Sequence, residues 1–197
     1  MNAATKDGAS KTITTPVTAA KARELRAGEV VFLSGTVMTA RDATHEYLLD
    51  EQRALPQSVV AALKHKVIFH CGPIVKQDPS GWVVKAAGPT TSARMNAVQA
   101  KVMQKYDIHA IIGKAGMQNV DWQKLDACYL AFVGGAAVLA KNAVTRVVDV
   151  AWLNELGMTE AAWVFQVEHF GPLIVAQDAH GSDLYADVLK KAARQAK

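Results

Sequence analysis

The sequence predicts an α/β fold in which a mixed β-sheet is covered by helices. Short apolar, β-branched runs alternate with segments of helical periodicity along the 197 residues, and such alternation is typical of α/β domains. The turn sequence Asp78-Pro79-Ser80-Gly81 separates two strand-like runs, so an antiparallel hairpin is also expected. Half of the residues are hydrophobic, and a chain of this length buries roughly 70% of its unfolded surface as one domain.

The first ninety residues are expected to alternate between strands and helices. Residues 1–12 are polar and alanine-rich and are interpreted as a disordered N-terminus, with a single domain over residues 13–197. The apolar stretch 30–37 predicts a buried strand in which Gly35 marks a bulge. Thr39 is expected to cap a helix that runs to about Arg53. The other elements expected in this half are a short strand at 12–15, helices at 18–26 and 56–63, and strands at 67–71 and 82–87.

The stretch from Gly88 to Met117, GPTTSARMNAVQAKVMQKYDIHAIIGKAGM, organises the rest of the chain. Its apolar residues recur three to four apart, which predicts a helix that begins at a Thr91 or Ser92 cap and ends at Asp107. The residues of that apolar face are Met95, Val98, Val102 and Tyr106. A buried strand at 109–112 and a glycine-flanked loop follow. Beyond it we expect helices at 121–127, 136–143 and 183–196, and strands at 129–133, 145–150, 163–167 and 173–176.

Residues at the start of this stretch suit an anion. A helix N-terminus offers free N–H groups and the positive end of the dipole. Arg94 lies in the expected first turn, and its planar fork matches a carboxylate. Lys114 lies in a loop where glycines let a ligand approach the backbone. A capped helix with two solvated cations fits the same residues, so spacing alone leaves both interpretations open.

Composition excludes several classes of protein. The net charge is +4 and the basic residues are scattered, which does not indicate a nucleic-acid partner. The longest apolar run, 127–140, falls short of the roughly 20 residues that span a bilayer, so no membrane association is expected. The two cysteines, Cys71 and Cys128, lie in apolar runs and lack metal-ligand spacing. Without a disulfide framework or an apolar signal region in residues 1–12, a cytoplasmic location is expected.

The segments GPTTSARM and GKAGM resemble the beta subunit of the two-subunit iron–sulfur hydro-lyases. These are L(+)-tartrate dehydratase and two-subunit class I fumarase, and the same unit forms the C-terminal domain of single-chain class I fumarases. The resemblance extends over residues 14–185 and implies the "swivelling" β/β/α domain, the mobile small domain of aconitase-like hydro-lyases. Further matching segments are LSGTVMTARDATH (33–45), FHCGPIVK (69–76), VGGAAVLA (133–140) and WLNELGMTEAAWVFQVEHFGPLIV (152–175).

The resemblance implies an enzyme that reversibly adds or removes water on a C4 dicarboxylate, either fumarate/malate or tartrate/oxaloacetate. Such a substrate carries two carboxylates, and each is best bound by a cationic group. Arg41 matches the family's substrate-binding arginine in TARDAxH, and Arg94 matches the arginine in GPTTxxRM. Lys114 matches the lysine of the GKxG loop. The loop departs from the usual GKGG or GKGN at Ala115, which costs about 1 kcal/mol if that residue needs a positive φ.

Thr90 matches the threonine that the family proposes as catalytic base, and Thr91 beside it is expected to bind substrate. A threonine is a poor base unless nearby cations lower its pKa. A helix cap or a simple hydrogen bond to a substrate carboxylate fits Thr90 as well. Arg41 lies four residues before His45, so the two share one helix face. His45 is expected to act as a capping residue or as a partner of the substrate-binding residues, and not to contact the substrate itself.

The resemblance also implies a [4Fe-4S] cluster with one open iron. Such a cluster takes three cysteine ligands, and this chain has two cysteines. The cluster is therefore expected on a partner alpha subunit, in an α2β2 assembly or around a beta–beta dimer, and no metal site is expected here. The alternatives are a stand-alone anion-binding or regulatory module without catalysis, and a purely structural subunit.

Overall fold

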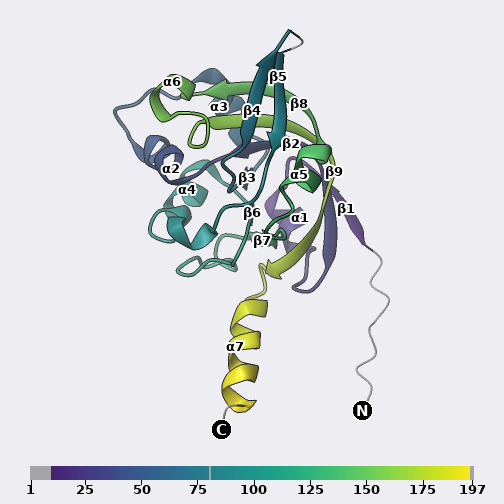
Figure 1. Cartoon of the computed structure of the whole chain (residues 1–197). Helices are drawn as coiled ribbons and strands as arrows, with labels where there is room; N and C mark the ends of the chain where they lie inside the picture. The colour runs from purple at the N-terminus through teal and green to yellow at the C-terminus, as the bar shows by residue number, and fades with distance from the viewer. Residues whose placement is uncertain (1–9, 80, 196–197) are drawn as a thin grey trace.

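The computed structural model describes residues 10–79 and 81–195, which contain a seven-stranded sheet in the order β1-β2-β3-β6-β7-β9-β8. Figure 1 shows the curved sheet with helices around it. Its strands are β1 (Lys11–Thr14), β2 (Val30–Thr39), β3 (Val67–Phe69), β6 (Ala110–Gly113), β7 (Cys128–Ala131), β8 (Val144–Ala151) and β9 (Ala162–Gln177). A separate antiparallel hairpin joins β4 (Ile74–Asp78) to β5 (Gly81–Ala86), as the turn sequence predicts.

The large sheet is mixed, which confirms the predicted fold class. β1, β2, β3, β6 and β7 run parallel, whereas β9 is antiparallel to β2, β7 and β8. Because β9 pairs with both β2 and β7, the pairings β2-β3-β6-β7-β9 form a closed ring. β9 is one strand of 16 residues, where the sequence predicts two. Gly35 lies at the predicted irregularity: its φ is +121°, and the β2–β9 register shifts there.

Helices cover the sheet on both faces, and the strands alternate between the two cores. Val67 and Phe69 face one apolar core, while Ile68 faces the other. Residues of α2, α3 and α4 belong to the core of Ile68, and residues of α1, α5 and the β4–β5 hairpin belong to the core of Phe69. The helices are α1 (Ala19–Arg23), α2 (Asp42–Leu49), α3 (Gln57–Leu63), the 3₁₀ helix η1 (Ser92–Met95), α4 (Gln99–Tyr106), α5 (Ala137–Ala143), α6 (Leu153–Leu156) and α7 (Leu184–Gln195).

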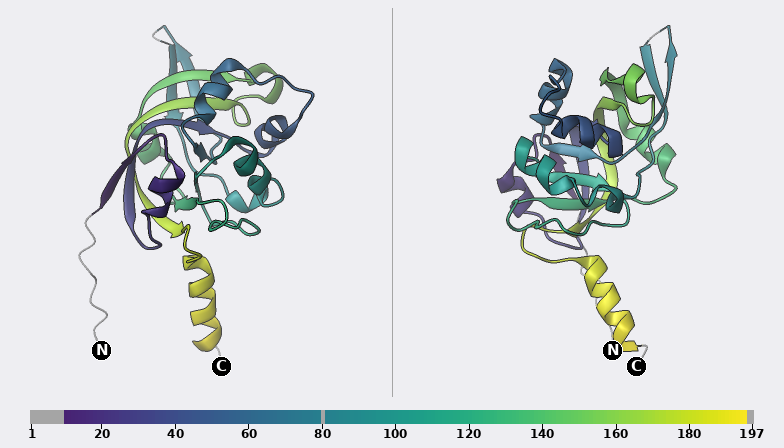
Figure 2. Two further views of the ribbon diagram at one scale, coloured as in Figure 1. Left: turned by 180° about the vertical axis from the view of Figure 1, so that it is seen from behind. Right: turned by 90° about the vertical axis from the view of Figure 1, so that its left-hand side faces the viewer.

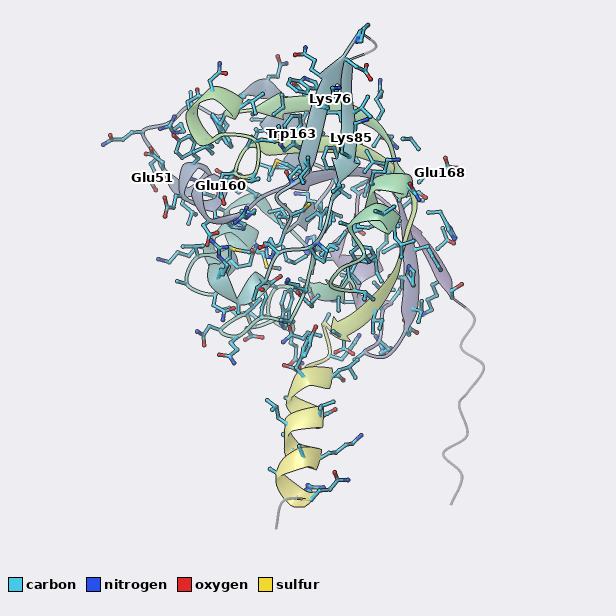
Figure 3. All side chains as sticks on the ribbon, in the orientation of Figure 1. Glu51, Lys76, Lys85, Glu160, Trp163 and Glu168 are labelled. Atoms are coloured by element: carbon cyan, nitrogen blue, oxygen red, sulfur yellow. The ribbon has the colours of Figure 1, made fainter. Side chains whose placement is uncertain are left out.

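Two peripheral elements stand away from this body. All three ribbon views show α7 projecting from the rest of the molecule, while the β4–β5 hairpin rises at the other end (Figures 1 and 2). The hairpin is fixed by Trp82, which packs edge-on against Trp163 at 5.2 Å between ring centroids. Figure 3 shows Trp163 next to the hairpin, whose Lys76 and Lys85 are exposed. No helix among the described residues is long and apolar enough to cross a membrane.

Three predictions about helices are wrong: one predicted helix is split in two, a second is absent, and a third begins without its predicted cap. The helix predicted from Thr91 or Ser92 to Asp107 is split into η1 and α4, because its first residues are fastened to the sheet edge: Ser92 N–H donates to the carbonyl of Lys114 at 3.1 Å. Its apolar face is nevertheless real, and Asp107 ends it with φ +56°. Residues 121–127 form turns and no helix.

Thr39 does not cap α2. Its hydroxyl donates to the carbonyl of Ala161 at 3.3 Å and accepts from the N–H of Trp163 at 3.0 Å, which ties β2 to β9 instead. Arg41 holds the N-cap position of α2 through its backbone. Of the predicted disordered segment, residues 1–9 lie outside the described residues, and Lys11 already belongs to β1.

Candidate functional site

Two predicted site residues, Arg41 and Lys114, and one histidine that was not predicted follow the carboxyl ends of the parallel strands. Arg41 comes two residues after β2, His70 directly after β3, and Lys114 directly after β6. Backbone hydrogen bonds keep these ends side by side, since Ala40 N–H donates to Phe69 at 3.0 Å and His70 N–H donates to Ile112 at 2.8 Å. Small-molecule sites of α/β sheets commonly lie at this edge.

The segment after β5 crosses the same edge. Thr90 N–H donates to the carbonyl of His70 at 2.7 Å, and Lys114 N–H donates to the carbonyl of Thr90 at 3.3 Å. Thr91 and Lys114 form a parallel bridge. These pairs place Thr90, Thr91 and Lys114 together, as half-buried residues of the edge. Among the described residues, no hydrogen bond or ion pair occupies the Thr90 hydroxyl or the Lys114 ammonium group.

Arg41 is held by a carboxylate of another element. Its Nη2 lies 3.2 Å from Oε1 of Glu160, and its Nη1 donates to the carbonyl of Thr159 at 3.4 Å. Figure 3 shows Glu160 beside α2. Gly72 makes the close approach possible, because a Cβ there would lie 2.6 Å from Arg41 Nη1. Its Nε is buried and lacks a partner among the described residues.

Arg94 also binds a carboxylate, that of Asp42. Nη2 lies 2.7 Å from Oδ2, and Nε lies 3.3 Å from Oδ1. Arg94 belongs to η1 and not to the first turn of a longer helix, so a helix dipole adds nothing there. Its side chain is 49% exposed, which leaves it free to exchange Asp42 for another carboxylate.

A buried polar network lies beneath these residues. His45 Nδ1 is 2.7 Å from the carbonyl oxygen of Arg41, and its Nε2 is 2.9 Å from the amide of Gln99. The same amide atom is 2.7 Å from His70 Nε2. Burial lowers the pKa of both histidines, and their mutual repulsion lowers that of His70 further. Both rings are therefore neutral at pH 7.

The network continues to the strand behind the Lys114 loop. His70 Nδ1 lies 2.8 Å from the hydroxyl of Ser92, which lies 2.8 Å from the hydroxyl of Tyr129. Gly113 makes room for this contact, because a Cβ there would lie 2.0 Å from Ser92 Oγ and 2.9 Å from Tyr129 Oη. Burial raises the pKa of Tyr129, so its phenol stays protonated.

The sequence analysis missed four members of this network: His70, Ser92 as a buried side chain, Gln99 and Tyr129. His70 ends an apolar strand and Tyr129 lies within one, and a polar side chain in such a run needs a partner. Gln99 lies among the apolar positions of the predicted helix. These signals indicate buried polar residues but do not indicate which ones meet, because 84 residues separate His45 from Tyr129.

The Lys114 loop adopts the geometry that a glycine would suit. Ala115 has φ +69° and Gly116 has φ +71°. A Cβ on Gly116 would lie 2.5 Å from the ring of Tyr185. A hollow lies between this loop and α7, lined by Ala93, Ala115, Gly116, Met117, Gln118, Asp183, Tyr185, Ala186, Val188 and Leu189. The condition under which Ala115 is strained is therefore met.

The residues of this chain do not fit an iron–sulfur cluster. Cys71 and Cys128 are buried and free, and the chain has only these two. Burial raises the pKa of both thiols, that of Cys128 to about 12, whereas a cluster is bound by thiolates. Among the described residues, no group of three or more His, Cys, Asp or Glu side chains is placed to hold a metal ion.

Comparison with known proteins gives one family. The sequence model described as "Fumarase C-terminus" matches residues 2–188. The L(+)-tartrate dehydratase subunit beta of Escherichia coli is 39% identical over 180 residues, which cover 90% of this chain and 87% of that protein. A putative L(+)-tartrate dehydratase subunit beta of Methanocaldococcus jannaschii is 41% identical over 172 residues, covering 86% and 88%. A putative class I fumarate hydratase of Geobacillus stearothermophilus is 39% identical over 183 residues, 91% of this chain but 34% of that protein.

Proposed function

The chain belongs to the fumarase C-terminus family, and from that premise we propose that it is the beta subunit of a hydro-lyase that adds or removes water on a C4 dicarboxylate. Its relatives carry the names of hydro-lyases, tartrate dehydratase and fumarate hydratase. The substrate pair is tartrate/oxaloacetate or malate/fumarate. The subunit contributes the groups that bind the substrate carboxylates and the proton-transfer group at Thr90.

The observation that carries this proposal is the state of the cations at the sheet edge. Arg41 and Arg94 are each held by a carboxylate of the chain, Glu160 and Asp42. Lys114 has no such partner among the described residues. A dicarboxylate needs at least two cationic sites, and arginine binds a carboxylate with two parallel hydrogen bonds. Glu160 and Asp42 occupy the arginines as a substrate carboxylate would.

In this proposal, substrate binding exchanges carboxylates. One substrate carboxylate replaces Asp42 on Arg94, whose side chain is the more exposed of the two arginines, and the other meets Arg41 or Lys114. Thr90 lies between His70 and Lys114 in the edge, with its N–H bonded to His70 and its hydroxyl free among the described residues. The nearby positive charges favour the alkoxide form that a threonine base requires.

This chain has only two cysteines, and both are buried thiols with a raised pKa. We therefore assign the iron–sulfur cluster to a partner alpha subunit and not to this chain. The name "subunit beta" of the relatives supports such a partner. The cluster, when bound, supplies a Lewis acid for the substrate hydroxyl. The open, half-buried edge around Thr90 is consistent with a site that a second subunit completes.

The test is reconstitution with a cluster-bearing alpha subunit of the family under anaerobic conditions. We expect the mixture to convert malate or a tartrate isomer, and each subunit alone to be inactive. The partner with cluster but without this chain is the control. Full activity of the purified, iron-free chain would contradict the half-site proposal. Binding of a dicarboxylate by the chain alone, with no turnover in any mixture, would favour the stand-alone anion-binding module.

A further inference from the structure

The buried network contains two neutral rings and one amide, and their donors and acceptors determine one another. His45 Nδ1 lies 2.7 Å from a carbonyl oxygen, that of Arg41. A carbonyl oxygen only accepts, so this nitrogen carries the hydrogen. A neutral imidazole has one N–H, which leaves His45 Nε2 as an acceptor. The Gln99 atom 2.9 Å away must then donate.

Only the amide nitrogen of Gln99 can donate, and its two hydrogens match two rings. The nitrogen and oxygen of a glutamine amide are assigned from their partners, and these partners place the nitrogen between His45 and His70. The second hydrogen goes to His70 Nε2, at 2.7 Å. His70 Nδ1 therefore carries its hydrogen and donates to Ser92 Oγ at 2.8 Å. Ser92 then donates to Tyr129 at 2.8 Å.

The opposite orientation of the amide is much less favourable. With the oxygen between the rings, His45 would carry hydrogens on both nitrogens and would be a cation with no exposed surface. The Asp42 carboxylate is near enough to favour that charge, but it makes no hydrogen bond or ion pair with His45 among the described residues. Burying a charge without a bonded counter-ion costs several kcal/mol. The other amide atom of Gln99 is buried without a partner there, and an unpaired carbonyl oxygen is tolerated better than an unpaired N–H.

We propose that Gln99 is a positioning residue, which donates to both His45 and His70 and so holds Arg41, Thr90 and Lys114 in register. Each end of the network contacts the backbone of a site residue. His45 Nδ1–H donates to the Arg41 carbonyl, the His70 carbonyl accepts from Thr90 N–H, and Ser92 N–H donates to the Lys114 carbonyl. The role rests on the proposed function, because those three residues are the proposed substrate groups. The donor pattern does not depend on it.

The test of the donor pattern is nitrogen NMR of the full chain labelled in histidine. The chain has six histidines, and we expect His45 and His70 to show the Nδ1–H tautomer at pH 7. An Nε2–H signal on either ring would overturn the proposal. In Gln99→Met, which keeps volume but cannot donate, we expect His70 to lose its single tautomer, whereas His45 should keep its Nδ1–H because the Arg41 carbonyl still accepts from it. An unchanged His70 tautomer in that variant would also overturn the proposal.

Kinetics of the reconstituted enzyme tests the positioning role. Gln99→Met should lower kcat/KM at least 10-fold, chiefly through KM, while the chain stays folded. The matched control is Gln166→Met, which removes a glutamine that bonds Thr36 at 3.1 Å, away from the network. Gln99→Glu can only accept when ionised, so His45 should become doubly protonated and the defect should persist. Wild-type kcat/KM in both Gln99 variants would contradict the role, whereas lack of activity in the wild-type mixture would count against the proposed function and not against the tautomers.

Discussion

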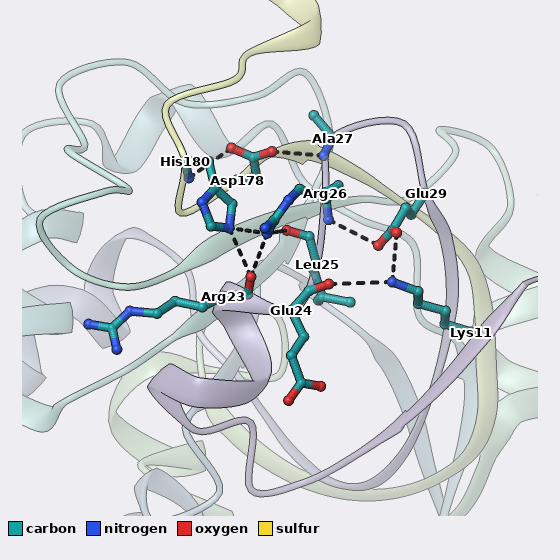
Figure 4. A network of polar contacts seen from close by, with 9 residues as sticks. All are labelled: Lys11, Arg23, Glu24, Leu25, Arg26, Ala27, Glu29, Asp178 and His180. Carbon is teal, nitrogen blue, oxygen red and sulfur yellow. Dashed lines mark hydrogen bonds and ion pairs between the residues drawn. The ribbon is translucent and has the colours of Figure 1, made fainter.

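The two ends of the parallel strands carry polar clusters that are built in opposite ways. Before β2, Arg26, His180 and neighbouring backbone groups bond one another at the surface, and Lys11 pairs with Glu29 at 2.6 Å (Figure 4). The Lys11 ammonium group is paired there with the Glu29 carboxylate, and Arg26 donates to the carbonyls of Arg23 and Leu25. After β2, the supporting network of His45, Gln99 and His70 is buried and neutral, and the charges lie above it.

We infer from this difference that the carboxyl end is the one available for a ligand. Charged groups that satisfy one another stabilise a fold, and the amino end joins α1 to the loop after β9 in this way. At the carboxyl end, Lys114 lacks a partner among the described residues, and Arg94 is held by an exchangeable carboxylate. The network of His45, Gln99 and His70 holds these cations in place and, because it is uncharged, does not neutralise them.

The largest expected effect comes from removing a threonine hydroxyl. Thr90→Val keeps the shape and should lower kcat of the reconstituted enzyme by roughly 10²–10⁴-fold, the usual contribution of a general base. Exchange of the substrate hydrogen with solvent should fall equally, while the melting temperature stays near that of the wild type. At the other end, Thr18 caps α1 by accepting from Lys21 N–H at 3.4 Å. Thr18→Val should leave kcat unchanged and cost about 1 kcal/mol of stability.

An unchanged exchange rate in Thr90→Val would place the base on the partner subunit. Thr90→Ser, which retains a hydroxyl, should keep measurable turnover. If Thr90→Val turns over substrate as fast as Thr90→Ser does, the hydroxyl plays no part in proton transfer.

The next effect compares two arginines that each bind an aspartate. Arg94→Lys keeps the charge but loses the planar fork, and should cost about 2–4 kcal/mol of transition-state binding in kcat/KM. Arg23 binds Asp126 with Nε 2.6 Å from Oδ1 at the other end. Arg23→Lys should leave kcat/KM unchanged and alter stability by less than about 1 kcal/mol. Equal kinetics for both variants would show that Arg94 is a surface ion pair only.

Acid unfolding should separate the two ends by pH. Burial holds the pKa of His45 and of His70 below the ordinary 6.5. The unfolded chain then binds more protons, so stability declines as the pH falls below 6.5, by up to about 1.4 kcal/mol per pH unit for each ring. His65, also shifted down by burial, adds to this slope. His70→Asn should reduce the slope between pH 6.5 and 5, as measured by urea unfolding.

The contribution of Asp178 to stability changes at a lower pH than that of the histidines. Burial alone would raise the pKa of Asp178, but the N–H groups of Ala27, Ser182 and His180 donate to it and hold the pKa below 3.8. Its contribution is present above 3.8 and is lost as the pH falls through the lowered value. Asp178→Asn should therefore leave the slope above pH 5 intact. A change of that slope would contradict the separation of the two ends.

The sequence predicted the fold better than the arrangement of the site. Alternation and turn residues are local, so the mixed sheet, the hairpin and the Gly35 bulge could be predicted. The face of Met95, Val98 and Val102 was correct, but a backbone bond from Ser92 to Lys114 interrupts the helix, and no local pattern reports that bond. Arg41 was selected as a candidate through the resemblance, and Lys114 was selected through its glycine-flanked loop as well. Gln99 was not, because its importance comes from two rings that lie 54 and 29 residues earlier in the chain.

The smallest expected effect on stability comes from non-glycine residues that have left-handed backbone conformations at the two ends of the strands. Lys66 and Asp126 have positive φ at the amino end, and each has an ion-pair partner, Asp107 at 2.9 Å and Arg23. Ala115 has φ +69° at the carboxyl end and is exposed, and an alanine side chain cannot form an ion pair that would offset the strain. A non-glycine residue in this region costs about 1 kcal/mol, so Ala115→Gly should stabilise the chain by up to that amount, reduced by the greater entropy of the unfolded glycine.

The matched substitution Lys66→Gly should destabilise the chain or leave it unchanged, because relief of strain is offset by loss of the pair with Asp107. Gly116→Ala should be strongly destabilising, because its Cβ would lie 2.5 Å from the ring of Tyr185. Chemical unfolding of the three variants measures these free energies. A loss of stability in Ala115→Gly would mean that the Lys114 loop is not strained, and that its departure from glycine has no energetic consequence for the aim of Lys114.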